Sequence, residues 1–401
     1  MSAPLRILQI TNRIPFPLND GGNIASYNVT YHLYKAGHEV TLASLNTKKH
    51  FQDPSVLENI ADVYACDIDT TVTLAGMLRG LFSTLPYNVK RFKSLRFEEM
   101  LRDILQKNEF DIIQVEGSYM ALYVHVLRKY SKAPVILRSH NIEHEIWERL
   151  AANESNPLKS WYFRLLAKKI KQFENETMHA FDAIAAITER DRDYYRRQGY
   201  NGLLYVINAG ADLERFKPDN SFLQKGTICF IAGMDWMPNQ QGLDWFLNKI
   251  WPEVKSKFPE VQFHIAGKAM PGRYFELKTP GVFIHGTVPD AIEYLQKYEI
   301  FIVPLLSGGG MRLKIVEGLA LGKCIVSTAI GAEGVGYSDG NDLVIADSPE
   351  EWITQLSFLL NNPERIKFIG KNASELAVHN YNWKNLVDTF IQLYHSMLQP
   401  K

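Results

Sequence analysis

Short apolar runs alternate with longer amphipathic segments along the chain. In the first half these runs are typical of buried strands, and they are RILQI, HEVTLAS, DIIQVE, PVILRS, AIAAIT and LLYVIN. Segments with apolar residues three or four positions apart separate them, as in residues 24–37, where Gly37 is a natural helix end. This alternation predicts a mostly parallel sheet with helices on both faces.

A second series of the same kind follows the polar stretch 220–226, which is typical of a linker. Its strand candidates are TICFIAG, VQFHIAG, VFIHG, IFIVPLL, KCIVST and DLVIA, and residues 240–258 have the periodicity of one long helix. We therefore expect two doubly wound α/β domains joined near residues 205–225, the first formed by residues 1–205 and the second by residues 206–382.

Composition narrows the class of protein. The 401 residues are enough for two domains, and 44 basic against 44 acidic side chains give no electrostatic reason to expect nucleic acid as a partner. Three scattered cysteines, without a CxxC pair, argue against a disulfide framework or a structural zinc site. The N-terminus lacks a signal-peptide pattern and no apolar run approaches membrane-spanning length, so we expect a cytoplasmic protein.

The most informative segment is residues 307–323, SGGGMRLKIVEGLALGK, which follows a strand and opens a helix. Backbone N–H groups at a helix start, together with Arg312 and Lys314, form an anion site. Glu317 would repel a lone phosphate, but a carboxylate accepts hydrogen bonds well from ribose hydroxyls. The segment therefore predicts a nucleotide site; the alternative is a glycine turn with a solvated lysine–glutamate pair. The phosphate-binding pattern GxxxxGK[ST] is absent.

Residues 304–335 resemble the nucleotide-sugar signature of the family-4 retaining glycosyltransferases. Residues 206–218 (VINAGADLERFKP), 282–304 and 15–23 (PFPLNDGGN) are similar to other segments of that family. The resemblance implies the GT-B fold, in which two Rossmann-like domains face each other across a cleft. Residues 383–401 resemble the helix that crosses back onto the N-terminal domain in this fold.

The resemblance also implies roles for individual residues. Glu317 would bind the ribose, the glycine turn with Arg312 and Lys314 would neutralise the leaving diphosphate, and His140 would contact the donor sugar near its reacting end. Glu116 also ends a strand and faces the same region, and from that position it would serve the acceptor side or orient His140. The implied catalytic residues are His140, Lys314 and Arg312, and the implied donor-binding residues are Gly21, Gly22, Gly286, Gly308, Gly309, Gly310, Met311, Arg312, Lys314 and Glu317.

The sequence departs from the family pattern at three positions. Gly309 occupies the place of the first of two glutamates, and Met234 and Asn239 stand where an arginine and a lysine are common. The combination of GMDWMPN with GGGMRLK and a following glutamate resembles a branch of the family in which these changes occur together. Lys268 is a candidate for a supplementary cation.

His140 and His144 lie four positions apart with glutamates nearby, so a metal site has to be considered. The segment is not HExxH and has no evident third ligand. The resemblance implies sugar transfer without metal or cofactor. A histidine that is simply hydrogen-bonded at a strand end is the structural alternative.

Residues 74–105 combine apolar and basic side chains: Leu78, Leu81, Phe82, Phe92 and Phe97 with Lys90, Arg91, Lys93 and Arg96. Such a stretch is a candidate for peripheral docking on the inner face of an anionic membrane. The alternative is helices packed on the sheet with a solvated basic face.

We therefore predict a retaining glycosyltransferase of polysaccharide or glycoconjugate biosynthesis. It would move a sugar from a nucleotide-diphosphate sugar, of UDP or GDP type, to a carbohydrate or lipid-linked hydroxyl acceptor. No double-displacement nucleophile is evident, which favours front-face attack by the acceptor. Two alternatives are a nucleotide-sugar epimerase of the same fold and a non-catalytic sugar-nucleotide-binding protein, the latter favoured by the missing glutamate and cations.

Overall fold

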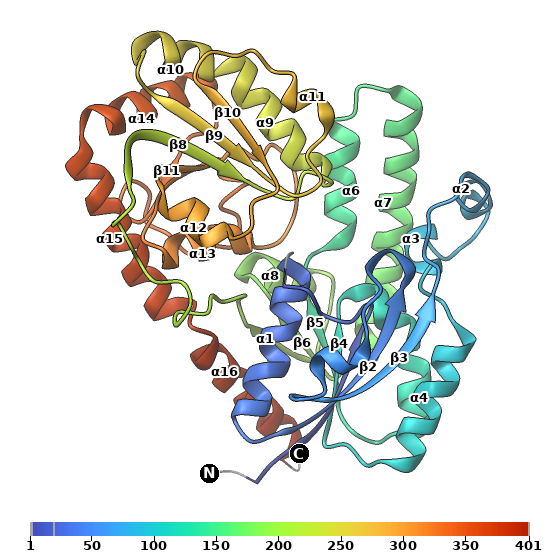
Figure 1. The fold of residues 1–401 in the computed structure, drawn as a ribbon. Helices are drawn as coiled ribbons and strands as arrows, with labels where there is room; N and C mark the ends of the chain where they lie inside the picture. Colours follow the sequence, from blue (N-terminus) through green and yellow to red (C-terminus); the bar gives the residue numbers. More distant parts are fainter. Residues whose placement is uncertain (1–2, 19–20, 400–401) are drawn as a thin grey trace. The chain divides into compact units, whose positions relative to one another are not determined.

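A computed structural model describes residues 3–18 and 21–399 of the chain (Figure 1). It divides into two compact units, Met1–Asn208 with Trp383–Lys401, and Ala209–Asn382. Part of the stretch 220–226 is not a linker, because strand β8 begins at Gln224. The N–H group of Gln224 donates to the carbonyl of Lys297, and that of Gly226 donates to the carboxylate of Glu299, so both residues are tied to the neighbouring strand β11.

The first unit contains a parallel sheet of seven strands in the order β3-β2-β1-β4-β5-β6-β7. The strands are β1 (Arg6–Thr11), β2 (Glu39–Thr47), β3 (Asp62–Ile68), β4 (Ile112–Glu116), β5 (Val135–Ser139), β6 (Ala183–Ala186) and β7 (Leu203–Val206). Sequence periodicity missed β3. It is an edge strand in which only Cys66 is buried, so it lacks the apolar run that marks the central strands.

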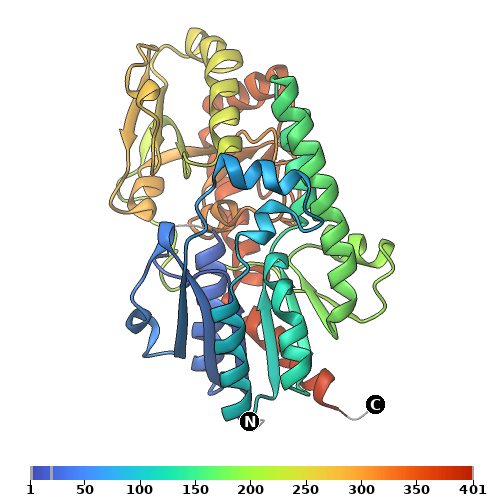
Figure 2. The same cartoon turned by 90° about the vertical axis from the view of Figure 1, so that its right-hand side faces the viewer.

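Helices pack on this sheet, with α1 and α16 on one side and α4 on the other (Figure 1). The α-helices are α1 (Gly21–Lys35), α2 (Leu74–Leu81), α3 (Tyr87–Lys90), α4 (Leu95–Lys107), α5 (Val124–Tyr130), α6 (Glu143–Ala152), α7 (Pro157–Thr177), α8 (Glu189–Arg197) and α16 (Trp383–Leu398). Short 3-10 helices are η1 (Lys48–His50), η2 (Pro54–Leu57), η3 (Ser118–Tyr123) and η4 (Met178–Ala180). Figure 2 shows α2 alongside α7, where the Lys169 amine donates to the carbonyls of Gly80, Leu81 and Ser83 at 2.7–2.9 Å.

The second unit contains a parallel sheet of six strands in the order β10-β9-β8-β11-β12-β13. The strands are β8 (Gln224–Ile231), β9 (Gln262–Ala266), β10 (Val282–Gly286), β11 (Tyr298–Val303), β12 (Cys324–Ser327) and β13 (Val344–Ile345). The helices are α9 (Met237–Lys249), α10 (Trp251–Lys257), α11 (Gly272–Phe275), α12 (Ala291–Gln296), α13 (Leu313–Ala320), α14 (Pro349–Asn361) and α15 (Pro363–Asn380).

Residues 240–258 do not form one helix, as their periodicity predicted. The chain breaks at Ile250, where φ is −117°, and a new helix starts at Trp251. Pro252 explains the break, because in a continuous helix it would have no N–H group to donate to the carbonyl of Asn248 and its ring would clash with that carbonyl. The apolar periodicity continues because both helices bury residues, among them Phe246, Trp251 and Val254, in the same core.

The predicted fold class is confirmed: two α/β units each carry a parallel, Rossmann-like doubly wound sheet. Parallel strands bring their carboxyl ends to one edge, where loops lead into helices and ligands bind. In the described ranges 3–18 and 21–399, no helix combines the length and apolar character needed to span a bilayer.

Close backbone packing beside the glycine turn gives a stability prediction. A Cβ atom added at Gly242 of α9 would lie 2.1 Å from the carbonyl oxygen of Pro304, just before the turn. We expect Gly242→Ala to lower the free energy of unfolding by about 1–3 kcal/mol, because the backbone must shift. Gly272→Ala is the matched control, since a Cβ atom there meets nothing within 4 Å. Chemical denaturation of both variants checks this; equal stability would contradict the packing.

Candidate active site

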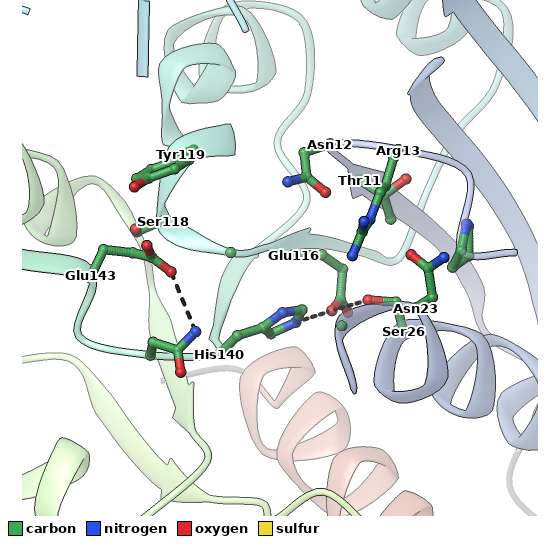
Figure 3. A pocket seen from close by; sticks show the side chains of 14 residues that line it. Thr11, Asn12, Arg13, Asn23, Ser26, Glu116, Ser118, Tyr119, His140 and Glu143 are labelled. Atoms are coloured by element: carbon green, nitrogen blue, oxygen red, sulfur yellow. Dashed lines mark hydrogen bonds and ion pairs between the residues drawn. The ribbon is translucent and has the colours of Figure 1, made fainter. Parts of the chain in front are cut away.

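The first unit contains a cavity of about 290 Å³ at the carboxyl ends of β1, β4 and β5 (Figure 3). Its walls come from the three connections that leave these strands. The lining residues are Thr11, Asn12, Arg13, Pro15, Gly22, Asn23, Ser26, Glu116, Gly117, Ser118, Tyr119, His140, Asn141 and Glu143. Three residues predicted from the sequence, Gly22, Glu116 and His140, thus line one cavity.

Glu116 is the centre of a buried hydrogen-bond network at the floor of this cavity. One carboxylate oxygen, Oε2, accepts from Nε2 of His140 at 2.7 Å, Oγ of Ser26 at 3.1 Å and Nη1 of Arg138 at 3.2 Å. The other, Oε1, accepts from the side-chain amide of Gln114. Glu116 is 3% exposed, so these donors replace water around the carboxylate.

Electrostatics keep Glu116 ionised. Burial alone would raise the pKa of its carboxyl, but the charge of Arg138 and the hydrogen bond from His140 outweigh burial and lower the pKa to about 2. An ionised carboxylate only accepts hydrogen bonds, so Nε2 of His140 must carry the hydrogen. The geometry thereby fixes the tautomer of a histidine that faces the cavity.

Arg138 connects this network to the C-terminal helix α16. Its side chain is 0% exposed, and its guanidinium lies 5.9 Å from the ring centre of Trp383 and 5.4 Å from that of Phe390. Within the described part of the chain, Nε and Nη2 of Arg138 have no hydrogen-bond partner. Tyr394, on the same helix, donates its hydroxyl to Oε1 of Gln114. Side chains of the sheet and of helix α16 therefore both support Glu116.

A second carboxyl in the cavity has the opposite character. Burial, followed by the negative charge of Glu174, raises the pKa of Glu143 to about 7. Glu174, on α7, accepts from the backbone N–H groups of Glu143 and His144 and from Nδ1 of His144 at 2.8 Å. It therefore caps the start of α6 and holds the segment that carries His140.

The two histidines considered for metal binding have different partners. His140 contacts Glu116, whereas His144 contacts Glu174 and is 1% exposed. Across residues 3–18 and 21–399, no three histidine, cysteine or acidic side chains cluster as metal ligands. The four-residue spacing arises because His140 follows the end of β5 and His144 lies in the first turn of α6.

The second predicted site lies on the β11–α13 connection of the other unit. Gly308 and Gly310 have positive φ values of 131° and 69°, which only glycine adopts readily. A Cβ atom at Gly308 would collide with Arg312 and Trp236. The Arg312 guanidinium folds back beneath the turn, donates to the carbonyl of Gly309 and lies 5.3 Å from the ring centre of Trp236. Arg312 is only 8% exposed, so it shapes the turn from within.

Lys314 is the more accessible cation of this connection. Its amine donates to Oδ1 of Asn239 at 2.9 Å and lies 5.5 Å from the ring centre of Phe230. Asn239 is itself held by a 2.8 Å bond from its Nδ2 to the carbonyl of Gly233. Burial, followed by the charge of Arg312, lowers the pKa of Lys314 to about 7. Asn239 is thus uncharged, but its hydrogen bond fixes the position of the Lys314 amine.

Glu317 lies one turn further along α13 but does not pair with Lys314. In the described residues its carboxylate accepts no hydrogen bond and forms no ion pair. Burial raises its pKa to about 7, and the positive charge of Arg215 offsets only part of that rise. The solvated lysine–glutamate pair considered from the sequence therefore does not form, because the Lys314 amine bonds Asn239 instead.

The remaining predicted residues lie as follows. Met311 is partly buried beside Arg312. Gly286 ends β10 with φ of 64°, and its carbonyl accepts from the N–H group of Gly267 at 2.7 Å. Strands β9 and β8 separate β10 from β11. Gly21 and Gly22 lie in the first turn of α1, not in a loop, while Asn19 and Asp20 of the same motif lie outside the described residues.

Met234, one of the departures from the family pattern, and Lys268, the candidate supplementary cation, have different surroundings. Met234 is fully buried in the core, so it contributes packing rather than polar contacts. Lys268 follows β9, and its Cε would lie 3.4 Å from a Cβ atom added at Gly233. It therefore lies near Asn239, whose amide bonds the same glycine.

Sequence reasoning missed Arg138, Gln114, Ser26 and Tyr394. A signal for Arg138 and Gln114 does exist, because each is a polar residue within an otherwise apolar buried strand. Ser26 and Tyr394 lie on helices and carry no comparable signal in the sequence.

Comparison with known proteins now adds to this geometry. The family described as Glycosyltransferase Family 4 matches residues 19–215, and the family described as Glycosyl transferases group 1 matches residues 225–362. An uncharacterized 44.6 kDa protein in the cps region of Klebsiella pneumoniae is 27% identical, covering 96% of this chain and 99% of its own length. An uncharacterized glycosyltransferase of Methanocaldococcus jannaschii is 22% identical, covering 79% and 83%.

Solved structures share the fold at low sequence identity. Sucrose-phosphate synthase from Thermosynechococcus elongatus superposes with a TM-score of 0.73 at 15% identity, covering 98% of this chain and 99% of that one. HepE of Anabaena, in complex with UDP, gives a TM-score of 0.69 at 13% identity and covers 98% and 100%.

The fold and these matches define the class of protein: two glycosyltransferase domains arranged along the chain as in the GT-B fold. More narrowly, it combines a family 4 glycosyltransferase domain with a group 1 glycosyltransferase domain, in that order. The predicted class of enzyme, a glycosyltransferase, is thereby confirmed.

The raised pKa of Glu317 predicts a pH-dependent gain in stability for Glu317→Gln. The folded-state pKa of about 7 exceeds the ordinary 4.5, so ionisation destabilises the folded protein progressively between these pH values. We expect Glu317→Gln to unfold with a free energy higher by on the order of 1–3 kcal/mol at pH 8 and almost unchanged at pH 4. Denaturant unfolding at both pH values measures this, with the exposed Glu276→Gln as control; an equal difference at both would contradict it.

Proposed function

We propose that the protein is a retaining glycosyltransferase that transfers a sugar from a nucleotide-diphosphate sugar to a hydroxyl acceptor without a metal ion. The observation that carries this proposal is that Lys314 and Glu317 of α13, although three residues apart, do not bond each other: Lys314 bonds Asn239 instead. One presents a fixed amine near the helix start, and the other presents a carboxylate with no partner among the described residues. A diphosphate followed by a ribose meets both requirements.

Ligands of the structural neighbours support a nucleotide donor. HepE of Anabaena has been solved with UDP and with UDP-glucose, although its 13% identity shows a shared fold alone. We take UDP-sugars as the first donors to test. We also propose that the chain lies in the branch of the family with GGGMRLK and a single glutamate. The hydrogen bond between Lys314 and Asn239 supports this, because it joins two residues of that branch's pattern.

The chemistry follows from where charge develops. As the bond between the anomeric carbon and the diphosphate oxygen breaks, negative charge builds on the diphosphate, where Lys314, the N–H groups of the turn and the start of α13 stabilise it. Arg312 contributes by holding the turn, and Lys268 is a candidate for a further contact. The acceptor oxygen bonds the anomeric carbon on the same face, and its proton passes to the departing diphosphate.

Glu116 is unsuited to act as a nucleophile in a double displacement. Its carboxylate is buried and bonded to His140, Ser26 and Arg138, so attack would break the network. This supports front-face attack. In the first unit, His140 would contact the donor sugar, and the cavity beside Glu143 would receive the acceptor hydroxyl.

Two substitutions separate the phosphate role from the ribose role. We expect Lys314→Ala to weaken binding of both UDP and inorganic pyrophosphate by about tenfold or more, because a charge-assisted hydrogen bond is lost. Glu317→Ala should weaken UDP similarly but leave pyrophosphate unchanged, because only UDP carries a ribose. Isothermal titration calorimetry measures both, with the exposed Lys278→Ala as control.

Unchanged UDP affinity in Lys314→Ala would overturn the phosphate assignment. Turnover then decides between the classes of function. Release of UDP that requires an acceptor indicates a transferase, and release without an acceptor favours an epimerase. Binding without release across a broad acceptor panel favours a non-catalytic protein. Nuclear magnetic resonance of the product's anomeric proton establishes retention.

A membrane surface is a second proposed partner. Phe92 and Phe97, counted from the sequence among the apolar residues of this stretch, are buried in the core and cannot contact lipid. Val72, Leu74, Leu78 and Phe82, in and around α2, are instead exposed, Phe82 to 93%. Lys90, Lys93 and Arg96 are exposed on the following segment. We propose that this patch docks on an anionic bilayer, where apolar insertion and charge attraction add.

Vesicle flotation tests the patch. We expect the protein to float with vesicles of phosphatidylcholine and phosphatidylglycerol at low salt, less at high salt, and not with phosphatidylcholine alone. Phe82→Asp should reduce binding severalfold, while Phe358→Asp, an exposed phenylalanine of α14, should not. Absence of binding to anionic vesicles at low salt would remove the membrane proposal.

A further inference from the structure

The charge balance around Glu116 depends on Arg138. Neighbouring strands β4 and β5 place the two residues opposite each other, and their side chains form an ion pair at 3.2 Å with both partners buried. Glu116 also contacts His140 at 2.7 Å. With Arg138 present, the buried carboxylate already has a counter-charge. Without it, the imidazole of His140 would be the nearest group able to supply one.

Arg138 itself depends on α16. Its guanidinium lies against Trp383 and Phe390, with Nε and Nη2 making no hydrogen bond in the described residues. Aromatic faces stabilise a desolvated guanidinium in the absence of water. On the other side of Glu116, Tyr394 fixes the Gln114 amide that donates to the carboxylate. Helix α16 therefore supports two of the residues that bond Glu116, Arg138 and Gln114, without lining the cavity.

We propose that Arg138, supported by Trp383 and Phe390 of α16, is a positioning residue that supplies the counter-charge of Glu116 and so holds His140 in its orientation in the cavity, with Tyr394 holding Gln114 on the other side of the carboxylate. This inference rests on the catalytic role proposed for His140. Arg138 touches no ligand; it acts through Glu116. The C-terminal helix is thus a working part of the first unit's site.

The other titratable groups that face this region are Arg13, Tyr119 and Glu143, which line the cavity. None of them is altered in the variants that test the proposal. Any change in the titration of His140 can therefore be assigned to the exchange at position 138.

The test compares variants of the full chain by nuclear magnetic resonance of labelled histidine rings. In Arg138→Met, the midpoint of the His140 titration should rise by about one pH unit or more, because the imidazolium becomes the counter-charge of Glu116. Arg138→Lys keeps the charge and should leave the midpoint nearly unchanged. The double variant Glu116→Gln/Arg138→Met removes both charges and should also show no rise.

The double variant also guards against misfolding, because a buried ion pair replaced as a whole is tolerated better than a single unpaired charge. Tyr394→Phe provides a milder check: kcat should fall by about tenfold while KM for the donor stays unchanged, because orientation and not donor binding is lost. A purely structural role would lower stability without moving the His140 titration.

Equal midpoints in Arg138→Met and the unchanged chain would overturn the proposal, as would a rise of the same size in Arg138→Lys. The titration requires no turnover, so it is independent of the proposed transferase reaction. If the titration shifts as expected but no acceptor supports transfer, the proposed function fails and the positioning of His140 stands.

Discussion

The buried ion pair between Glu116 and Arg138 is the interaction on which the first unit's site depends. Two charges in an apolar sheet are favourable only when each is paired and further hydrogen-bonded or otherwise stabilised. Glu116 satisfies this through His140, Ser26 and Gln114, and Arg138 through the rings of α16. The network that stabilises the buried carboxylate of Glu116 therefore also orients His140.

In the second unit, by contrast, the protein compensates its buried charged groups only in part. Lys314 and Glu317 are held where burial disfavours their charged forms, and only Lys314 receives a protein partner, the neutral amide of Asn239. The fold therefore compensates little of the cost of burying these two charges, and the proposed nucleotide donor would supply the missing partners. Such a site sacrifices stability for binding, as functional sites commonly do. The replacement of a family lysine by Asn239 is consistent with this, since an amide orients the remaining cation without repelling it.

The sequence was most informative where one element decides the outcome. Apolar runs located the central strands, and the strand-end positions of Glu116 and His140 followed from the parallel topology. It was least informative where distant segments meet. The edge strand β3 lacks a buried run, and the break at Ile250 was hidden by continuous periodicity. The hydrogen bond from Tyr394 to Gln114, which holds Gln114 against Glu116, joins residues 280 positions apart, and no local pattern predicts a contact of that kind.

The first unit is formed by two separate stretches of the chain, so it is completed only after the second stretch has been synthesised. Residues 1–208 leave the ribosome well before Trp383, yet the guanidinium of Arg138 is enclosed by rings that belong to residues 383 and 390. During synthesis the intervening unit can fold while the first still exposes a charged gap in its sheet. His140 therefore acquires its final support only after residues 383–394 have been synthesised, by which time the intervening unit has also been made.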